Sequence, residues 1–246
     1  MFIVIIYSTG MICYFTQKEG VFVPYLDGIF YELDIANKTA TIRNITKTNS
    51  NPEIKIPSNV KGYKVVKIAS EAFMHSKHLR EISLPITIEV IGKRAFKECQ
   101  ALTQVKLESR QINIGEHAFF GCKNLMVVSS ANWNTTIFPT GYGVFQQCIN
   151  VQFIDIDFGG SVRTSTFDCC NAITALRFAH NTTLKTDAIK NCPKLTTIYI
   201  NGQFDASRPM LRKMRKYKII CDELSNVIEL VYDGYWVEID DNTLPF

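Results

Sequence analysis

The chain has 246 residues, of which 46% are hydrophobic and 20% are charged, a composition typical of a globular protein of one large domain or two small ones. Its net charge of +4 is small for this length, so no nucleic-acid partner is indicated. No stretch approaches the roughly 18 consecutive apolar residues that a membrane-spanning helix requires. The sequence therefore predicts no transmembrane span.

Residues 1–15 (MFIVIIYSTGMICYF) are mostly apolar and carry no charge. The run is as long as the hydrophobic region of a secretory signal, but the first basic residue is Lys18, and no small-residue cleavage site follows. Two interpretations of residues 1–19 stay open. One is a degenerate signal or anchor, and the other is a capping strand or hairpin with a turn at residues 8–10.

Residues 20–53 are predicted to form an N-terminal β cap. Residues 28–35 and 39–44 alternate between apolar and polar side chains, as strands do, on either side of a turn at Asn37 and Lys38. The polar residues 46–52 (TKTNSNP) then lead into the remainder of the chain as a loop.

The strongest signal is a repeat that spans about residues 54–202. Each unit has an anchor, a cysteine or serine three residues later, and then apolar residues spaced as L-x-x-I-x-L. Successive anchors are 23, 23, 26, 22 and 22 residues apart. The anchors, which number repeats one to six, are Phe73, Phe96, Phe119, Phe145, Phe167 and Ile189.

The repeat predicts a solenoid, because each unit holds one short strand whose apolar side chains point to one face. A single unit cannot bury that face, whereas stacked units bury it against each other. With strands about 4.8 Å apart, six units make an array roughly 30 Å long.

The C-terminal residues 203–246 are predicted to cap the last repeat. Residues 209–216 (PMLRKMRK) suit a short helix with Leu211 and Met214 facing inward. Residues 227–239 suit a hairpin with a type I′ turn at Asp233 and Gly234. The basic residues between 208 and 218 are interpreted as a solvated face of the cap, with phosphate or glycan binding as the alternative.

Residues 79–102 (LREISLPITIEVIGKRAFKECQAL) resemble, almost position by position, the unit of the BspA-like, or Treponema pallidum-type, leucine-rich-repeat family. The resemblance implies an α/β leucine-rich-repeat solenoid dominated by β-structure, with six repeats of about 22–23 residues. It also implies a surface or secreted protein that adheres to host proteins, other microbes or glycans. The later repeats lack the I-G-x-x-A-F element of the family, so the array departs from the pattern toward its C-terminal end.

Five cysteines occupy the same place in the repeat, three residues after the anchor. Metal binding and disulfide bonding are the functional interpretations, but no C-x-x-C pair is present, and a ladder of small buried thiols is favoured. No nucleophile or phosphate-loop motif accompanies the four histidines, so we expect no catalytic residues, no metal and no cofactor. The five cysteines are Cys99, Cys122, Cys148, Cys170 and Cys192.

The outward positions of the strands are the candidate binding surface. In each L-x-x-I-x-L segment the third and fifth residues would form two parallel columns on one sheet face. Exposed apolar groups on such a face are a sign of a protein or glycan contact, with an ordinary solvated face as the alternative. The strand residues chosen as candidates are Lys106, Phe153, Asp155, Arg177 and Tyr199.

The longest spacing, 26 residues, places an insertion in residues 129–143 (SSANWNTTIFPTGYG). Insertions in solenoids map to loops on one face, often the binding face. Trp133, Phe138 and Tyr142 make this segment a second candidate contact region, with local packing as the alternative.

These observations predict a non-enzymatic, monomeric binding protein of the cell surface or of the secreted fraction that recognises a protein or glycan, such as a host matrix or plasma protein. The alternative is an intracellular protein–protein interaction scaffold of the same fold. Fold alone does not decide between them.

Overall fold

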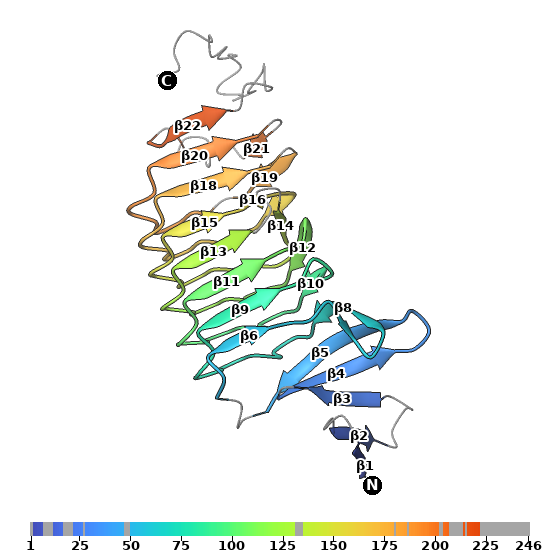
Figure 1. The fold of residues 1–246 in the computed structure, drawn as a ribbon. Coiled ribbons are helices and arrows are strands. Elements are labelled where there is room, and N and C mark those ends of the chain that lie inside the picture. The colour runs from blue at the N-terminus through green and yellow to red at the C-terminus, as the bar shows by residue number, and fades with distance from the viewer. Residues whose placement is uncertain are drawn as a thin grey trace.

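The computed structural model describes residues 2–6, 12–16, 22–26, 28–46, 50–130, 135–179, 181–185, 187–201, 204–206, 214 and 216–221. Side chains are described within these ranges except in residues 2–26 and 204–206 and at Asp155 and Cys221. Figure 1 shows a solenoid with an antiparallel sheet at its N-terminal end. The array of six repeats predicted from the sequence is confirmed, and the solenoid is almost entirely β-structure.

An antiparallel meander opens the chain, and each strand pairs with the next along the sequence. The hairpin predicted around Asn37 and Lys38 is present, and the backbone N–H of Asn37 donates to Asp34 Oδ1 at 3.0 Å. The strands are β1 (Phe2–Ile6), β2 (Ile12–Thr16), β3 (Phe22–Leu26), β4 (Ile29–Asp34) and β5 (Thr39–Ile45).

The first side of the solenoid is a five-stranded parallel sheet, in the order β6-β9-β11-β13-β15. Strands of successive repeats pair in register, so that Gln104 of repeat 2 lies between Glu81 and Val127. These strands are β6 (Glu53–Lys55), β9 (Glu81–Leu84), β11 (Gln104–Leu107), β13 (Val127–Ser130) and β15 (Phe153–Asp155).

The second side is also parallel, and its first strand, β8, pairs with β5, so the meander and the solenoid share one sheet. Short β7 (Asn59–Val60) pairs with β8 in the antiparallel sense. The second-side strands are β8 (Tyr63–Ile68), β10 (Val90–Ile91), β12 (Gln111–Ile114) and β14 (Thr136–Pro139).

The two sides exchange strands in repeat 4, where the sequence had predicted one uninterrupted sheet for all six repeats. After β15 the chain continues as β16 (Asp157–Phe158), which pairs with β14 of the second side and with β18 (Ala175–Phe178) of the first. The first side continues through β20 (Thr197–Ile200) and β22 (Lys218–Cys221). The second side continues as a separate sheet of β17 (Ser161–Val162), β19 (Thr182–Leu184) and β21 (Phe204–Ala206).

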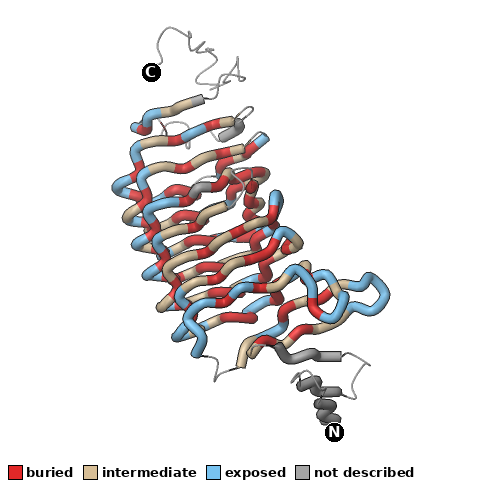
Figure 2. The backbone as a smooth tube through the Cα atoms, in the orientation of Figure 1, coloured by how far each residue is buried: buried red, intermediate tan, exposed pale blue. Residues whose placement is uncertain are grey.

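The core is a stack of equivalent side chains. The rings of Phe73, Phe96, Phe119 and Phe145 lie nearly parallel, with centroids 5.0, 5.0 and 5.2 Å apart, close to the spacing of paired strands. The step from Phe145 to Phe167 widens to 6.0 Å, where Phe158 of β16 lies edge-on against both rings. Figure 2 shows the buried residues running through all six repeats.

A corner of tight turns carries each anchor. In repeat 1 the amides of Ala72, Met74 and Ser76 each donate to the carbonyl three residues earlier. The residues two before and two after every anchor have positive φ, such as 63° at Glu71 and 60° at His75, as type II turns require. Between these bonds, the anchor amide donates to the next repeat, as in Phe73 N–H to Ala95 O at 2.8 Å.

The C-terminal cap lies mostly outside the described part of the chain, including the hairpin predicted for residues 227–239. Within the predicted helix, residues 214 and 216 are described, and Met214 is helical and buried, while the helix itself stays a prediction. In the described part of the chain no helix is long and apolar enough to cross a membrane.

Glycines of the corner mark where successive repeats approach most closely. A Cβ on Gly92 would lie 2.5 Å from the backbone nitrogen of Ser70, and one on Gly115 would lie 2.7 Å from that of Lys93. Gly92→Ala should therefore lower the free energy of unfolding by about 2 kcal/mol or more, measured by urea denaturation, because backbone atoms cannot move aside cheaply.

The matched control for this substitution is Gly121→Ala, where the added Cβ would meet only the flexible Glu98 side chain, at 3.2 Å. With its φ of 67°, that change should cost about 1 kcal/mol through backbone strain alone. Equal losses for the two variants would contradict the close approach at Gly92.

Candidate functional site

The candidate site is the outward face of the first-side strands. Burial alternates along β9, β11 and β18, so the third and fifth positions of each L-x-x-I-x-L segment face outward, as predicted. The second position lies at the edge of the same face. In repeats 1 to 6 the second-position residues are Arg80, Thr103, Met126, Gln152, Thr174 and Thr196.

Both predicted cationic residues of this face are already paired with acids from neighbouring strands. The Lys106 ammonium forms an ion pair with Glu81 of repeat 1. Arg177 Nε lies 3.2 Å from Asp157 Oδ1, and the Asn201 amide donates to the other oxygen of Asp157 at 3.3 Å. The local charges are therefore balanced, and the face offers no concentrated charge of either sign.

The predicted fifth-position column is interrupted between repeats 4 and 5. Asp155 lies beside Ser129 as expected, but Arg177 pairs with Asp157, two residues further along the chain. The strand of repeat 4 is longer than its equivalents and breaks between β15 and β16, so its two halves follow different registers. Asp157, which the sequence analysis did not select, occupies the place beside Arg177.

Phe153 is the most exposed large apolar residue of the face, at 54%. Val127 lies beside it in β13, but within the described residues no strand pairs with β15 on its other side, because β18 pairs with β16. Met126, 43% exposed, and Tyr199, 37% exposed, add to the apolar surface. The second-position column was not considered in the sequence analysis, and Met126 was therefore missed.

An uncharged stripe runs through the centre of the face. We define it as the second- and third-position residues of repeats 2 to 6, none of which is charged. Arg80 and Glu81 lie at one end, and Lys106 and Arg177 lie along the side. The stripe comprises Thr103, Gln104, Met126, Val127, Gln152, Phe153, Thr174, Ala175, Thr196 and Thr197.

The second predicted contact region, residues 129–143, does not form one surface loop. Two of its three extra residues fall between β13 and β14, since β14 starts nine residues after β13 whereas β12 starts seven after β11. The third falls between Pro139 and Phe145. Phe138 belongs to β14, and a Cβ on Gly159 would lie 2.8 Å from its ring.

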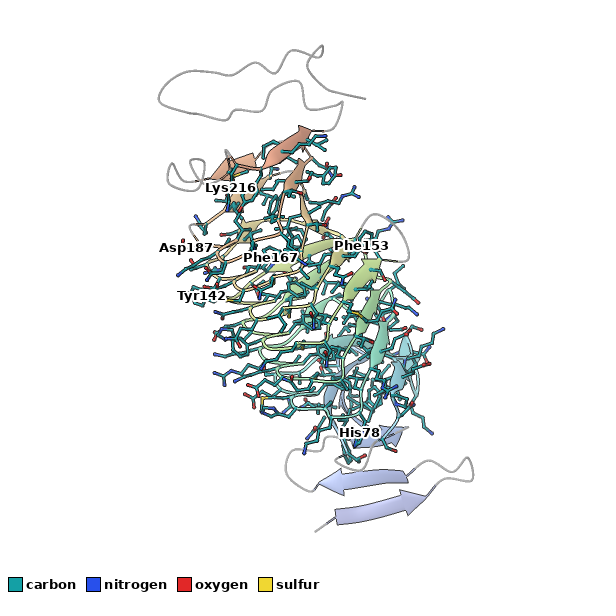
Figure 3. The ribbon with its side chains drawn as sticks, turned by 90° about the vertical axis from the view of Figure 1, so that its left-hand side faces the viewer. His78, Tyr142, Phe153, Phe167, Asp187 and Lys216 are labelled. Atoms are coloured by element: carbon teal, nitrogen blue, oxygen red, sulfur yellow. The ribbon has the colours of Figure 1, made fainter. Side chains whose placement is uncertain are left out.

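Tyr142 of that segment lies away from the strand face. Figure 3 shows Tyr142 on the corner side of the solenoid, together with Asp187, whereas Phe153 lies on the strand side and Phe167 inside. Tyr142 is 54% exposed there. Trp133 lies among residues 131–134, outside the described residues, so its contact role stays a prediction.

The cysteine ladder has a packing role in the structure. Each thiol donates to the carbonyl of the anchor in the preceding repeat, as Cys99 Sγ does to Phe73 O at 3.0 Å and Cys148 Sγ to Phe119 O at 3.1 Å. All six cysteines with described side chains are free thiols. Cys169, outside the ladder, is half-buried, with its thiol 3.5 Å from Asp168 Oδ1.

Other chemical groups do not converge on a site in the described ranges. His75 and His117 lie at the corners, each within 3.4 Å of a glutamate side chain, and His78 is exposed. Among the residues with described positions, no group of three or more His, Cys, Asp and Glu residues can hold a metal ion. A shallow depression of about 340 Å³ between Lys55, Pro57, Ser83 and Glu108 is lined by one cation and one anion.

The in-register strands, the anchor stack and the alternation of buried and outward side chains define a leucine-rich-repeat solenoid, a fold associated with protein–protein interaction. The sequence profile of the BspA type leucine rich repeat region matches residues 66–196 in six copies. The chain therefore belongs to the BspA-type leucine-rich-repeat family.

Solved structures agree with this fold. A leucine-rich-repeat protein of T. pallidum is similar with a TM-score of 0.61 and 19% identity, over 82% of this chain and 98% of that one. A leucine-rich cell surface protein of Faecalibacterium prausnitzii A2-165 is similar with a TM-score of 0.56 and 22% identity, over 89% of this chain and 59% of that one. A search of curated proteins finds no match.

Burial of the cysteine thiols should make the stability of the protein depend on pH. Desolvation raises the pKa of the Cys148 thiol to about 12, against an ordinary value of about 9. Below pH 9 the thiol is neutral in both the folded and the unfolded chain, and its burial contributes fully to the free energy of unfolding. Between pH 9 and 12 this contribution is lost as pH rises, because the unfolded chain releases a proton that the folded chain retains. The serine in Cys148→Ser cannot titrate in this range. Above pH 9 the unfolding free energy of this variant should therefore fall less steeply than that of the wild type, with slopes that differ by up to about 1.4 kcal/mol per pH unit.

The measurement is urea denaturation of both proteins between pH 8 and 11. Cys169→Ser is the control, because its half-buried thiol should contribute less to the slope than Cys148 does. Parallel stability curves for the wild type and Cys148→Ser would show that the Cys148 thiol titrates equally in both states.

Proposed function

We propose that the protein is a non-enzymatic binding protein of the cell surface or the secreted fraction, and that the uncharged stripe is its contact surface for a protein or glycan. The observation that carries the proposal is Phe153, exposed at the centre of a face whose charged residues lie at its end and side. Interface centres are depleted in charge and enriched in aromatic residues and Met, whereas their rims are polar.

The predicted candidates take distinct roles in this proposal. Phe153 is the anchor, and Tyr199 extends the apolar surface two repeats further on. Lys106 and Arg177, each held by an acid, form a polar rim that fixes orientation more than it adds affinity. Asp155, whose backbone pairs with Ser129, stays a predicted member of this rim. The expected absence of a nucleic-acid partner is consistent with this balance of charge.

The relatives support a binding role. Leucine-rich-repeat proteins typically bind other proteins and lack catalytic activity. The F. prausnitzii protein is described as a cell surface protein, which supports the same compartment for this chain. Host proteins and glycans are then the ligand classes to test first.

An intracellular interaction scaffold is the second candidate. The observation that favours it is the backbone of β1 and β2, which pair with each other and through β3 with the rest of the sheet. A segment that belongs to the folded sheet would not be removed during export. Fractionation of the native cell, with the mass of the N-terminal peptide, distinguishes the two compartments.

Phe153→Ala should weaken binding at least tenfold to any ligand captured from a panel of matrix proteins, plasma proteins and glycans, because truncation of a central aromatic anchor removes about 2 kcal/mol or more. Stability should hardly change, since the side chain is half outside the fold. Surface plasmon resonance gives the affinity and thermal melting gives the stability.

Tyr142→Ala is the matched control, because Tyr142 has the same exposed fraction, 54%, on the opposite corner. Its affinity should equal that of the wild type. If Tyr142→Ala loses binding and Phe153→Ala does not, the contact surface lies on the corner and the proposal for the stripe is wrong.

A further inference from the structure

Second-position carbonyls form a regular hydrogen-bond column beside the stripe. The carbonyl of Arg80 accepts two amides of repeat 2, from Thr103 at 2.8 Å and Gln104 at 3.1 Å. Thr103 and Met126 accept two amides each from repeats 3 and 4 in the same way. These two hydrogen bonds therefore fix the start of each strand relative to the strand of the preceding repeat.

The column is interrupted once, between repeats 4 and 5. The carbonyl of Gln152 accepts neither Thr174 N–H nor Ala175 N–H, and Thr174 N–H has no hydrogen-bond partner among the described residues. One repeat later the column resumes, and Thr174 O accepts Thr196 N–H at 3.0 Å and Thr197 N–H at 3.2 Å. Within the described part of the chain, a backbone acceptor and a backbone donor thus remain without a protein partner at one point of the sheet face.

The register shift explains this interruption. Since Arg177 pairs with Asp157 rather than Asp155, the strand of repeat 5 is displaced by two residues relative to that of repeat 4. Gln152 and Thr174 are both exposed residues, so a ligand can approach this point of the face. Phe153, adjacent to Gln152 in sequence, is the exposed anchor of the stripe.

We infer that the stripe binds an extended, uncharged polypeptide segment whose backbone forms hydrogen bonds with Gln152 O and Thr174 N–H. This inference rests on the proposed function and names the partner of the same site. A peptide group carries one donor and one acceptor, which are what the interrupted column lacks. An apolar side chain of the segment would then lie against Phe153 and Met126.

The charge of the surroundings favours this ligand over an ionic one. The second- and third-position residues of repeats 2 to 6 contain no charged side chain, and Lys106 and Arg177 are already paired with acids. A charged ligand would therefore meet no counter-charge within the stripe itself. Extended peptides are recognised elsewhere by backbone bonds for affinity and by side-chain contacts for specificity.

The peptide side of the test uses a library of twelve-residue peptides of Ser, Thr and Gln with one central Leu, Ile or Phe. The tightest binder is then resynthesised with a single N-methyl group at each amide in turn. One N-methylated position should weaken binding at least tenfold, because its N–H can no longer donate to Gln152 O. Equal affinities across the N-methyl series would overturn the inference.

The second test changes the protein, with Thr174→Pro, which removes an amide that donates to none of the described residues. Peptide binding should weaken at least tenfold while the melting temperature stays close to that of the wild type. The control is Thr196→Pro, which removes an amide bonded to Thr174 O and should lower the melting temperature. If Thr174→Pro does not fold, the N-methyl series decides the question alone.

The results distinguish a failure of the peptide inference from a failure of the proposed contact surface. If a captured folded protein or glycan binds and Phe153→Ala weakens it, but no peptide of the library binds, the stripe is a contact surface and the peptide inference is wrong. If the peptides bind and both Phe153→Ala and Thr174→Pro leave their affinity unchanged, the stripe is not the site and both proposals fall.

Discussion

The structure depends on each repeat burying its apolar face against the next repeat. One repeat has a single short strand and one corner, and its apolar side chains are buried only when the next repeat lies about one strand spacing away. The phenylalanine rings, the anchor carbonyls that accept thiols, and the amides on both sides of each corner all obey this spacing. Stability therefore accumulates repeat by repeat, and a local change in spacing has consequences on every side of the solenoid.

Repeat 4 shows these consequences together. Three extra residues precede its anchor, and the strand that follows it runs from the first side toward the second. The anchor stack opens from about 5 Å to 6.0 Å, and Phe158 fills the added space edge-on. On the outside, β15, which carries Phe153, is hydrogen-bonded to β13, and β18 of the next repeat pairs with β16 instead. The most accessible apolar residue of the face is thus a product of imperfect repetition.

The regular part of the structure could be predicted from the sequence because identical positions recur at fixed spacing. The anchors, the ladder of cysteines and the outward orientation of Phe153 and Tyr199 all follow from that period. The exchange of strands could not be predicted, since the repeat spacing specifies neither where the strand of repeat 4 breaks nor which side each half joins. Asp157 was missed for this reason, because counting from the anchor points to Asp155. Met126 was missed because the pattern places it outside the strand, although it lies at the edge of the exposed face.

The direction of the bonds between repeats has a mechanical meaning. They run from one repeat to the next along the solenoid axis, so tension on the two ends would load each interface as a zipper that peels open, one repeat at a time. The interface between repeats 4 and 5 has fewer of these bonds, since Gln152 O accepts neither Thr174 N–H nor Ala175 N–H, and the anchor rings there are 6.0 Å apart. Under load this interface would therefore part more readily than its neighbours, and the solenoid would divide into a block of four repeats and a block of two.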